Sequence, residues 1–183
     1  MPDMPPADTP QRYTRTAVSL HWLIGLALLG QITFGFLLDT IAPRGTPARS
    51  GTINLHKSFG IVLAVLIGVR LSWRLSHRAP AWPASMEPWE RQAAQRVHRA
   101  LYACMLLMPL SGFTASNFSR FGIRFFGFPW ASWGPDAPQL YAVFSGIHLA
   151  TAYVFCALIA VHVLAALKHA LVDRDSVFSR MLL

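Results

Sequence analysis

Four long apolar stretches alternate along the chain with shorter segments that are rich in proline and charge. The apolar stretches cover residues 17–38, 53–75, 97–118 and 140–172. Each has at least the roughly 20 residues that a helix needs to cross about 30 Å of hydrocarbon. Prolines between the stretches fall where each helix should end. The pattern predicts an all-α integral membrane protein, a four-helix bundle that forms one domain over residues 13–183.

The first twelve residues are rich in proline and lack the basic start of a secretory signal. They precede an apolar stretch of full membrane-spanning length, without an obvious small-residue cleavage site. We therefore expect residues 1–12 to form a retained, disordered tail.

Composition separates two explanations of the excess positive charge. The 183 residues include 16 Lys and Arg against 8 Asp and Glu, yet only 13% are charged and 54% are hydrophobic. A nucleic-acid binder presents its basic residues on a polar surface, which this composition cannot supply. We expect a membrane protein with basic loops and no nucleic-acid partner.

The basic residues are distributed unequally between the two sides of the predicted bundle. Ten of them belong to the side of the two termini and the loop between the second and third stretches: Arg12, Arg15, Arg74, Arg78, Arg91, Arg96, Arg99, Lys168, Arg174 and Arg180. Five belong to the opposite side: Arg44, Arg49, Lys57, Arg120 and Arg124. By the positive-inside rule both termini face the cytoplasm.

Histidines inside the apolar stretches are the candidate functional residues, since ionisable groups at membrane depth are costly. In the fourth stretch His148 and His162 lie 14 residues apart, which is about 320° of helical rotation and about 21 Å of rise, so they share a face. Because successive helices alternate in direction, His21 lies level with His162 and His56 with His148. The sequence predicts two histidine pairs, one near each membrane surface.

Two facing neutral imidazoles are the ligand set of a bis-histidine haem iron. Zinc usually takes three or four ligands, often with Cys or carboxylate, and neither is level with these pairs. A proton relay usually recruits Asp or Glu, and the apolar stretches contain almost none. Helix packing by histidine remains the alternative for any single position.

Glycine repeats the 14-residue offset, since Gly35 follows His21 and Gly112 follows His98. Glycine there allows close approach to a flat cofactor, or simply close packing of membrane helices. Arg70 lies 14 residues after His56 and suits a haem propionate, unless it extends to the interface. His98 and His169 are candidates for a quinone pocket, or solvated histidines beside basic loops.

With these features the chain resembles the bacterial four-helix di-haem cytochrome b561 family over residues 13–183. The resemblance rests on SLHWLIG, NLHKSFG, GVRLSWRL, RVHRALYACMLLMPLSGF, GIHLATAYVF and VHVLAALKH. It implies two b haems, with His21 and His162 as axial ligands of the inner one and His56 and His148 of the outer one.

The resemblance also implies electron transfer between a small donor and a membrane quinone in the bacterial inner membrane, with ubiquinone as acceptor. Superoxide is one candidate donor, because a basic outer face attracts small anions. The alternative function is a haem-carrying membrane anchor of a larger dehydrogenase or hydrogenase, with a soluble redox partner. A non-haem transporter or structural membrane protein is a third class. The Phe-rich residues 121–130 suit an amphipathic interfacial segment or a wall for quinone.

Overall fold

A computed structural model describes residues 12–83 and 85–182 and consists mainly of four long helices. The expected tail, residues 1–12, lies outside these residues except for its last position. The long helices are α1 (Arg15–Ile41), α2 (Ala48–Ser76), α3 (Pro88–Asn117) and α4 (Pro138–Lys168). A short hairpin of β1 (Ile123–Phe125) and β2 (Phe128–Trp130) joins α3 to α4, and a π-helix, η1 (His169–Asp173), and α5 (Ser176–Ser179) follow α4. Each predicted apolar stretch lies essentially within a long helix, and the fourth continues into η1.

The helices begin where local signals favour them. The Thr14 hydroxyl accepts the Ala17 N–H at 3.3 Å and caps α1. Pro88 and Pro138 occupy the first turns of α3 and α4, where a missing N–H costs nothing. The Glu90 carboxylate accepts the Glu87 N–H at 3.1 Å and closes the start of α3.

Within the described residues, three helices are long and apolar enough to cross a membrane: α1, α2 and α4 continued by η1. The third predicted span, in α3, is not among them, because that helix is charged at its start and polar at its end. Glu90, Arg91 and Arg96 lie in its first turns, and Ser116 and Asn117 in its last. Its 30 residues nevertheless give about 45 Å of helix, enough to span a bilayer.

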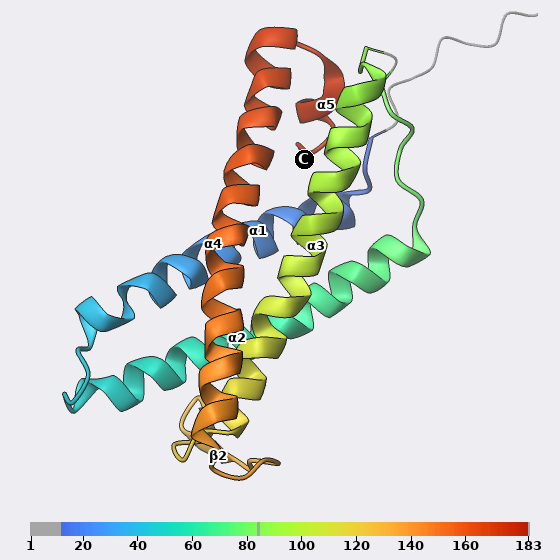
Figure 1. Ribbon diagram of the computed structural model, residues 1–183. Coiled ribbons are helices and arrows are strands. Elements are labelled where there is room, and N and C mark those ends of the chain that lie inside the picture. The colour runs from blue at the N-terminus through green and yellow to red at the C-terminus, as the bar shows by residue number, and fades with distance from the viewer. Residues whose placement is uncertain (1–11, 84, 183) are drawn as a thin grey trace, which may run out of the picture.

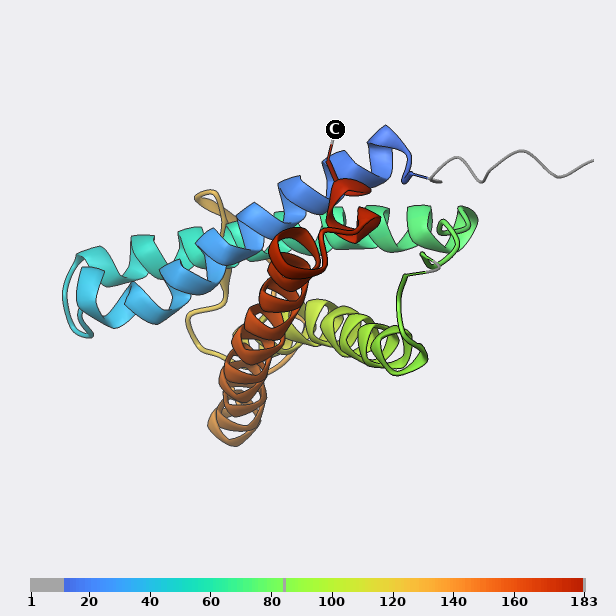
Figure 2. The same cartoon turned by 90° about the horizontal axis from the view of Figure 1, so that it is seen from above.

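The long helices form two antiparallel pairs, α1 with α2 and α3 with α4. The first pair crosses the second at a steep angle in both views (Figures 1 and 2). The arrangement is therefore two crossed helical hairpins rather than four near-parallel helices. The hydrophobic core lies where the pairs cross, and all four long helices contribute to it: Ile24, Leu28, Ile32, Leu63, Ile67, Cys104, Met105 and Phe155.

The Phe-rich segment folds as a β-hairpin, which the sequence analysis did not anticipate. Strands β1 and β2 pair antiparallel, with Phe125 opposite Phe128. The two residues of the turn, Phe126 and Gly127, both have positive φ, 47° and 94°, as a two-residue hairpin turn requires. We call this end of the molecule the hairpin end.

The opposite end contains the start of α1 and the C-terminal segment, and we call it the terminal end. The indole Nε1 of Trp22 donates to the Met181 carbonyl at 2.7 Å. Arg180 donates to the carbonyl of Ala81, in the segment between α2 and α3, at 2.5 Å. The last residues therefore fold back across the helix ends and connect α1 to the α2–α3 segment.

Candidate functional site

The predicted pairing of His56 with His148 is present at the hairpin end. Their ring centres lie 6.3 Å apart and the rings are nearly perpendicular, at 87°. A metal bound about 2 Å from one nitrogen of each imidazole would separate the ring centres by roughly 6 Å. The spacing therefore fits a metal held between two histidines.

Two glycines make room for this pair. A Cβ at Gly35 of α1 would lie 3.0 Å from His56 Cε1, and one at Gly112 of α3 would lie 2.9 Å from His148 Cε1 and Nδ1. Both distances are too short for a side chain without displacement of the imidazole. The glycines spaced 14 residues after His21 and His98 thus pack directly against the rings at the opposite level.

Hydrogen bonding fixes the orientation of one ring in this pair and leaves the other with an unpaired atom. His148 Nδ1 lies 2.8 Å from the Met108 carbonyl, which only accepts, so the ring proton is on Nδ1 and Nε2 keeps its lone pair. Metal-binding histidines commonly have this second contact. His56 Nδ1 is buried and has no partner among the described residues, which costs about 1–3 kcal/mol and favours a bound group beside it.

The second predicted pair lies at the terminal end. The ring centres of His21 and His162 are 6.1 Å apart at an interplanar angle of 75°, so the spacing also fits a two-imidazole metal site. The ring of His98, from α3, lies 5.3 Å from that of His162. The structure therefore brings three histidines together here, whereas depth arguments alone found no partner for His98.

Arg70 contacts this cluster directly. Its guanidinium lies 3.2 Å from His21 Nδ1 and donates to the Ala17 carbonyl at 3.3 Å. Because a guanidinium only donates, His21 Nδ1 accepts, and the neutral ring then keeps its proton on Nε2. Binding of a metal through His21 Nε2 therefore requires the proton to move to Nδ1 and Arg70 to find another acceptor.

An apolar layer separates the two pairs. Counting seven residues from His21, His56, His98 and His148 reaches Leu28, Leu63, Met105 and Phe155. All four are buried members of the core, and Phe155 is 1% exposed. Seven residues correspond to about 10.5 Å of rise. Each long helix thus supplies one buried side chain midway between the two histidine levels.

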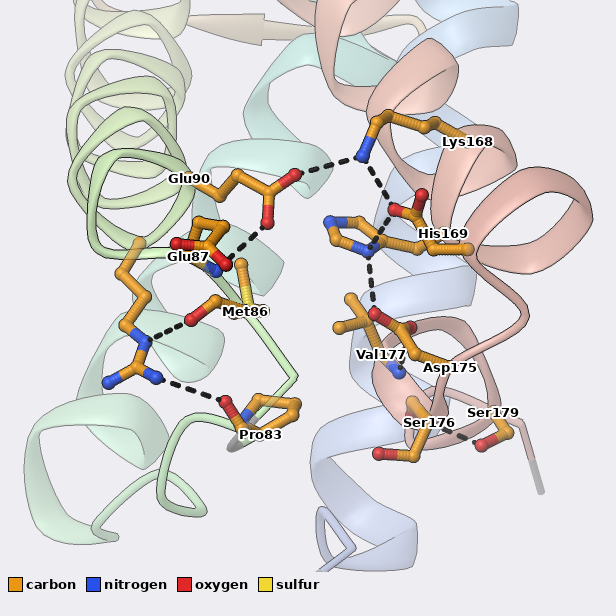
Figure 3. Close-up of polar contacts among 12 residues, drawn as sticks. Pro83, Met86, Glu87, Glu90, Lys168, His169, Asp175, Ser176, Val177 and Ser179 are labelled. Carbon is orange, nitrogen blue, oxygen red and sulfur yellow. Dashed lines mark hydrogen bonds and ion pairs between the residues drawn. The ribbon is translucent and has the colours of Figure 1, made fainter.

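His169 lies in a separate ionic cluster at the terminal end (Figure 3). Its Nδ1 is 2.8 Å from an Asp175 oxygen and 3.1 Å from an Asp173 oxygen, and Lys168 bridges Asp173 at 2.6 Å to Glu90 at 2.8 Å. The hydrogen bond from Lys168 holds the pKa of Glu90 below its ordinary value. The cluster joins the end of α4 to the start of α3.

Glu90, His169 and Asp173 form the only group of three or more candidate metal ligands found close together within residues 12–83 and 85–182. The Lys168 ammonium lies against two of the three, which favours an ion-pair network over a metal site there. Each histidine pair in turn offers a metal two imidazole ligands, as a haem requires and as a tetrahedral zinc site does not.

Gln31 is the polar residue of α1 that the sequence analysis did not single out. Its side-chain amide donates to the His56 carbonyl at 2.6 Å, which ties α1 to α2 beside the hairpin-end pair. The available signal was an isolated amide in an otherwise apolar membrane stretch, since such groups need a partner.

The histidines and glycines occur in a chain that matches known proteins along its whole described length. Residues 12–183 match the family model for prokaryotic cytochrome b561. Among curated proteins, cytochrome b561 homolog 2 of Escherichia coli K12 is 30% identical, covering 96% of this chain and 93% of its own. Cytochrome b561 homolog 1 of the same organism is 28% identical, covering 93% and 97%. A probable superoxide oxidase CybB of Yersinia pestis is 26% identical, covering 94% and 96%.

The match covers more than nine tenths of the chain and includes all four long helices and every histidine discussed above. Three of the helices are suited to a bilayer by length and composition. The chain therefore belongs to the prokaryotic cytochrome b561 family, bacterial membrane proteins that use haem b to transfer electrons across the membrane.

Proposed function

We propose that this protein conducts electrons across the bacterial inner membrane through two b haems, from a small donor to a membrane quinone such as ubiquinone. The observation that carries the proposal is the pair of histidine sites, one at each end of the helices, with ring centres about 6 Å apart. The haems supply one-electron chemistry, and the protein supplies ligands, orientation and electrostatic surroundings.

His56 and His148 would hold the haem at the hairpin end. The Met108 carbonyl keeps the His148 proton on Nδ1, which leaves Nε2 to bind iron. Gly35 and Gly112 leave the space that the two rings occupy. These contacts come largely from the backbone, so this ligand pair is preorganised.

His21 and His162 would hold the haem at the terminal end, with Arg70 as the partner of an anionic group. Iron bound at His21 Nε2 leaves the ring proton on Nδ1, where the Arg70 guanidinium can no longer donate. A buried cation then needs another acceptor, and a haem propionate provides one. His98, beside His162, and His169 remain proposed contacts of a quinone.

The membrane topology proposed here has four spans with both termini in the cytoplasm. The helix α3 lies antiparallel beside α4 (Figure 1), and its length suffices for a fourth span. Most Lys and Arg residues outside the spans are at the terminal end, which supports a cytoplasmic position for that end.

Superoxide is the donor that we propose for the hairpin end. The support is the similarity to a protein named as a probable superoxide oxidase and the basic residues of that end. Some of these are already engaged: Arg49 pairs with Asp39 at 2.7 Å and Lys57 donates to the Gly122 carbonyl at 2.7 Å. The remaining charge attracts small anions toward the His56 end.

Haem content and donor oxidation test the proposal in sequence. Detergent-purified protein should contain two b haems per chain, and His21→Ala and His56→Ala should each remove a different one. Loaded protein should then reduce a quinone with superoxide, and His56→Ala should abolish this. Two haems without quinone reduction, together with co-purification of a dehydrogenase or hydrogenase from native membranes, would favour the anchor-subunit alternative. A folded protein that takes up no haem would refute both.

A further inference from the structure

A groove of about 330 Å³ lies between α1 and α2, close to the hairpin-end histidines. Gly30, Gln31 and Phe34 line it from α1, and Phe59 and Val62 are among the residues that line it from α2. Phe59 and Val62 are exposed on the surface of these apolar helices, so the groove opens toward the lipid. Its volume is at the lower limit of small-molecule sites, which are about 300–1,000 Å³, and suits a ring rather than a whole lipid.

The groove combines apolar walls with one polar side chain. Gln31 is the only polar residue that lines it, and none of the lining residues is ionisable. The amide has two N–H donors and one acceptor, and the bond to the His56 carbonyl uses one donor. A second donor and the acceptor are left for a neutral ligand, whereas a charged head group would find no counter-ion.

The groove is directly connected to the histidine pair. Phe34 lines the groove, and its ring centre lies 5.8 Å from that of His56. Gln31 bonds the backbone of the same histidine. A ligand in the groove is thus separated from the His56 ring by a single phenyl ring.

The β-hairpin contributes to the outer margin of the groove. The ring of Phe126 lies 5.5 Å from that of Phe59, edge to face. Phe126 occupies a left-handed backbone conformation, φ 47°, which a bulky residue adopts at a cost and glycine does not. The Phe126 N–H donates to the Ser58 hydroxyl at 2.9 Å, which holds this strained turn against α2. The strain therefore keeps an aromatic ring beside the groove.

We propose that the α1–α2 groove binds the head group of the membrane quinone, at the hairpin end and within reach of the lipid phase. The inference rests on the proposed function, in which a quinone accepts the electrons, and adds the position of its site. A quinone ring is flat, neutral and lipid-soluble, and its carbonyl oxygens accept hydrogen bonds. Phe34 and Phe59 offer it aromatic faces and Gln31 an amide donor. An acyl chain would use neither feature of the amide.

Photolabelling of the haem-loaded protein in quinone-free nanodiscs tests this assignment. The probe is a short-chain azido-ubiquinone, competed by an unlabelled short-chain ubiquinone, and labelled peptides are identified by mass spectrometry. We expect competable labelling within residues 27–34 and 59–66. Gln31→Leu removes the amide donor and should weaken labelling about tenfold.

A second variant fills the groove, and a matched one does not. A Cβ at Gly30 or at Gly68 meets no atom within 4 Å, so either position accepts a larger side chain. Gly30 lines the groove and Gly68 does not. Gly30→Leu should therefore reduce labelling about tenfold or more by occupying the site, whereas Gly68→Leu should leave it unchanged. Haem spectra of each variant report whether the fold and ligands survive.

The outcomes separate this inference from the function on which it rests. Competable labelling at other residues, or equal labelling in Gly30→Leu, would overturn the groove assignment and leave quinone reduction intact. Absence of labelling anywhere in haem-loaded wild-type protein would count against the quinone acceptor itself. Displacement of the probe by an excess of a lipid acyl chain, but not by unlabelled quinone, would identify the groove as a lipid site and overturn the assignment.

Discussion

The two histidine pairs have nearly the same ring spacing, 6.3 and 6.1 Å, but different surroundings. At the hairpin end the backbone surrounds the rings: Gly35 and Gly112 face them and the Met108 carbonyl holds His148. At the terminal end side chains do so, with Arg70 on His21 and a third histidine, His98, beside His162.

This difference predicts two kinds of site. Backbone contacts cannot rotate away, so the His56–His148 pair has little freedom to adjust and depends on the exact space beside it. The His21–His162 pair is next to a long cationic side chain, so its electrostatics are set by one mobile charge. The first site should respond mainly to volume, and the second mainly to charge.

The largest expected effect comes from filling the space beside the hairpin-end pair. In Gly112→Ala a methyl group would lie 2.9 Å from His148 and displace its ring. We expect binding of the hairpin-end haem to weaken about 10- to 100-fold, as when a ligand's support is lost, while the other haem stays. Haem content and redox titration of the purified protein measure this.

The matched control is Gly25→Ala, because a Cβ at Gly25 meets no atom within 4 Å. It should leave both haems bound. If Gly112→Ala also keeps both haems with unchanged potentials, the glycine serves helix packing alone and the volume argument for this end fails.

The histidine pairs themselves could be predicted from the sequence, because helix rise and direction determine their levels. His148 and His162 lie 14 residues apart on one helix, and the alternation of spans assigns His21 and His56 to opposite ends. The glycines could also be found by the same offset. That they face the imidazoles could not be predicted, since it depends on how the two helical pairs cross.

Features created by long-range contacts were not predictable. The hairpin of residues 123–130 has strands of only three residues and an aromatic run that equally suits an interfacial segment. His169 was expected near a quinone, but its bonds to Asp173 and Asp175 depend on the return of the chain after η1. The role of His98 beside His162 stays a prediction.

A smaller effect should follow from removing the charge at the terminal end. Arg70→Leu removes a cation next to His21, which stabilises the oxidised, more positive form of the nearby haem. Its midpoint potential should fall by on the order of tens of millivolts, with the hairpin-end haem unchanged. Arg70→Lys, which keeps the charge, should restore most of the potential. Equal shifts of both haems would contradict a local role for Arg70.

A still smaller and local effect is expected at the hairpin. The buried Ser58 hydroxyl accepts the Phe126 N–H at 2.9 Å and donates to the Asn54 carbonyl at 2.8 Å. Ser58→Ala leaves the Phe126 N–H without its partner, at a cost of about 1 kcal/mol. Hydrogen exchange of residues 121–130 should become about fivefold faster. Ser76→Ala, which removes a hydroxyl bonded only within its own helix end, is the control and should not change it.

The smallest effect concerns the ionic cluster that joins α3 to the C-terminal segment. Lys168 holds the pKa of Glu90 below its ordinary 4.5, so the contact is stabilising above that pH and is lost as pH falls through the lower, folded value. His169, Asp173 and Asp175 face the same lysine or each other and also titrate. The informative quantity is therefore the difference between the wild-type protein and Glu90→Gln.

At pH 7 the C-terminal residues 174–182 should exchange hydrogen faster in Glu90→Gln than in the wild type, and the two should converge as the pH falls below about 4.3, the usual carboxyl value. The difference should be modest, because exposed ion pairs are screened by water and salt. Asp136→Asn removes an exposed carboxylate from the other end of the molecule and should match the wild type throughout. Convergence already at neutral pH would mean that the Trp22 and Arg180 contacts, rather than the Glu90 ion pair, hold the C-terminal segment in place.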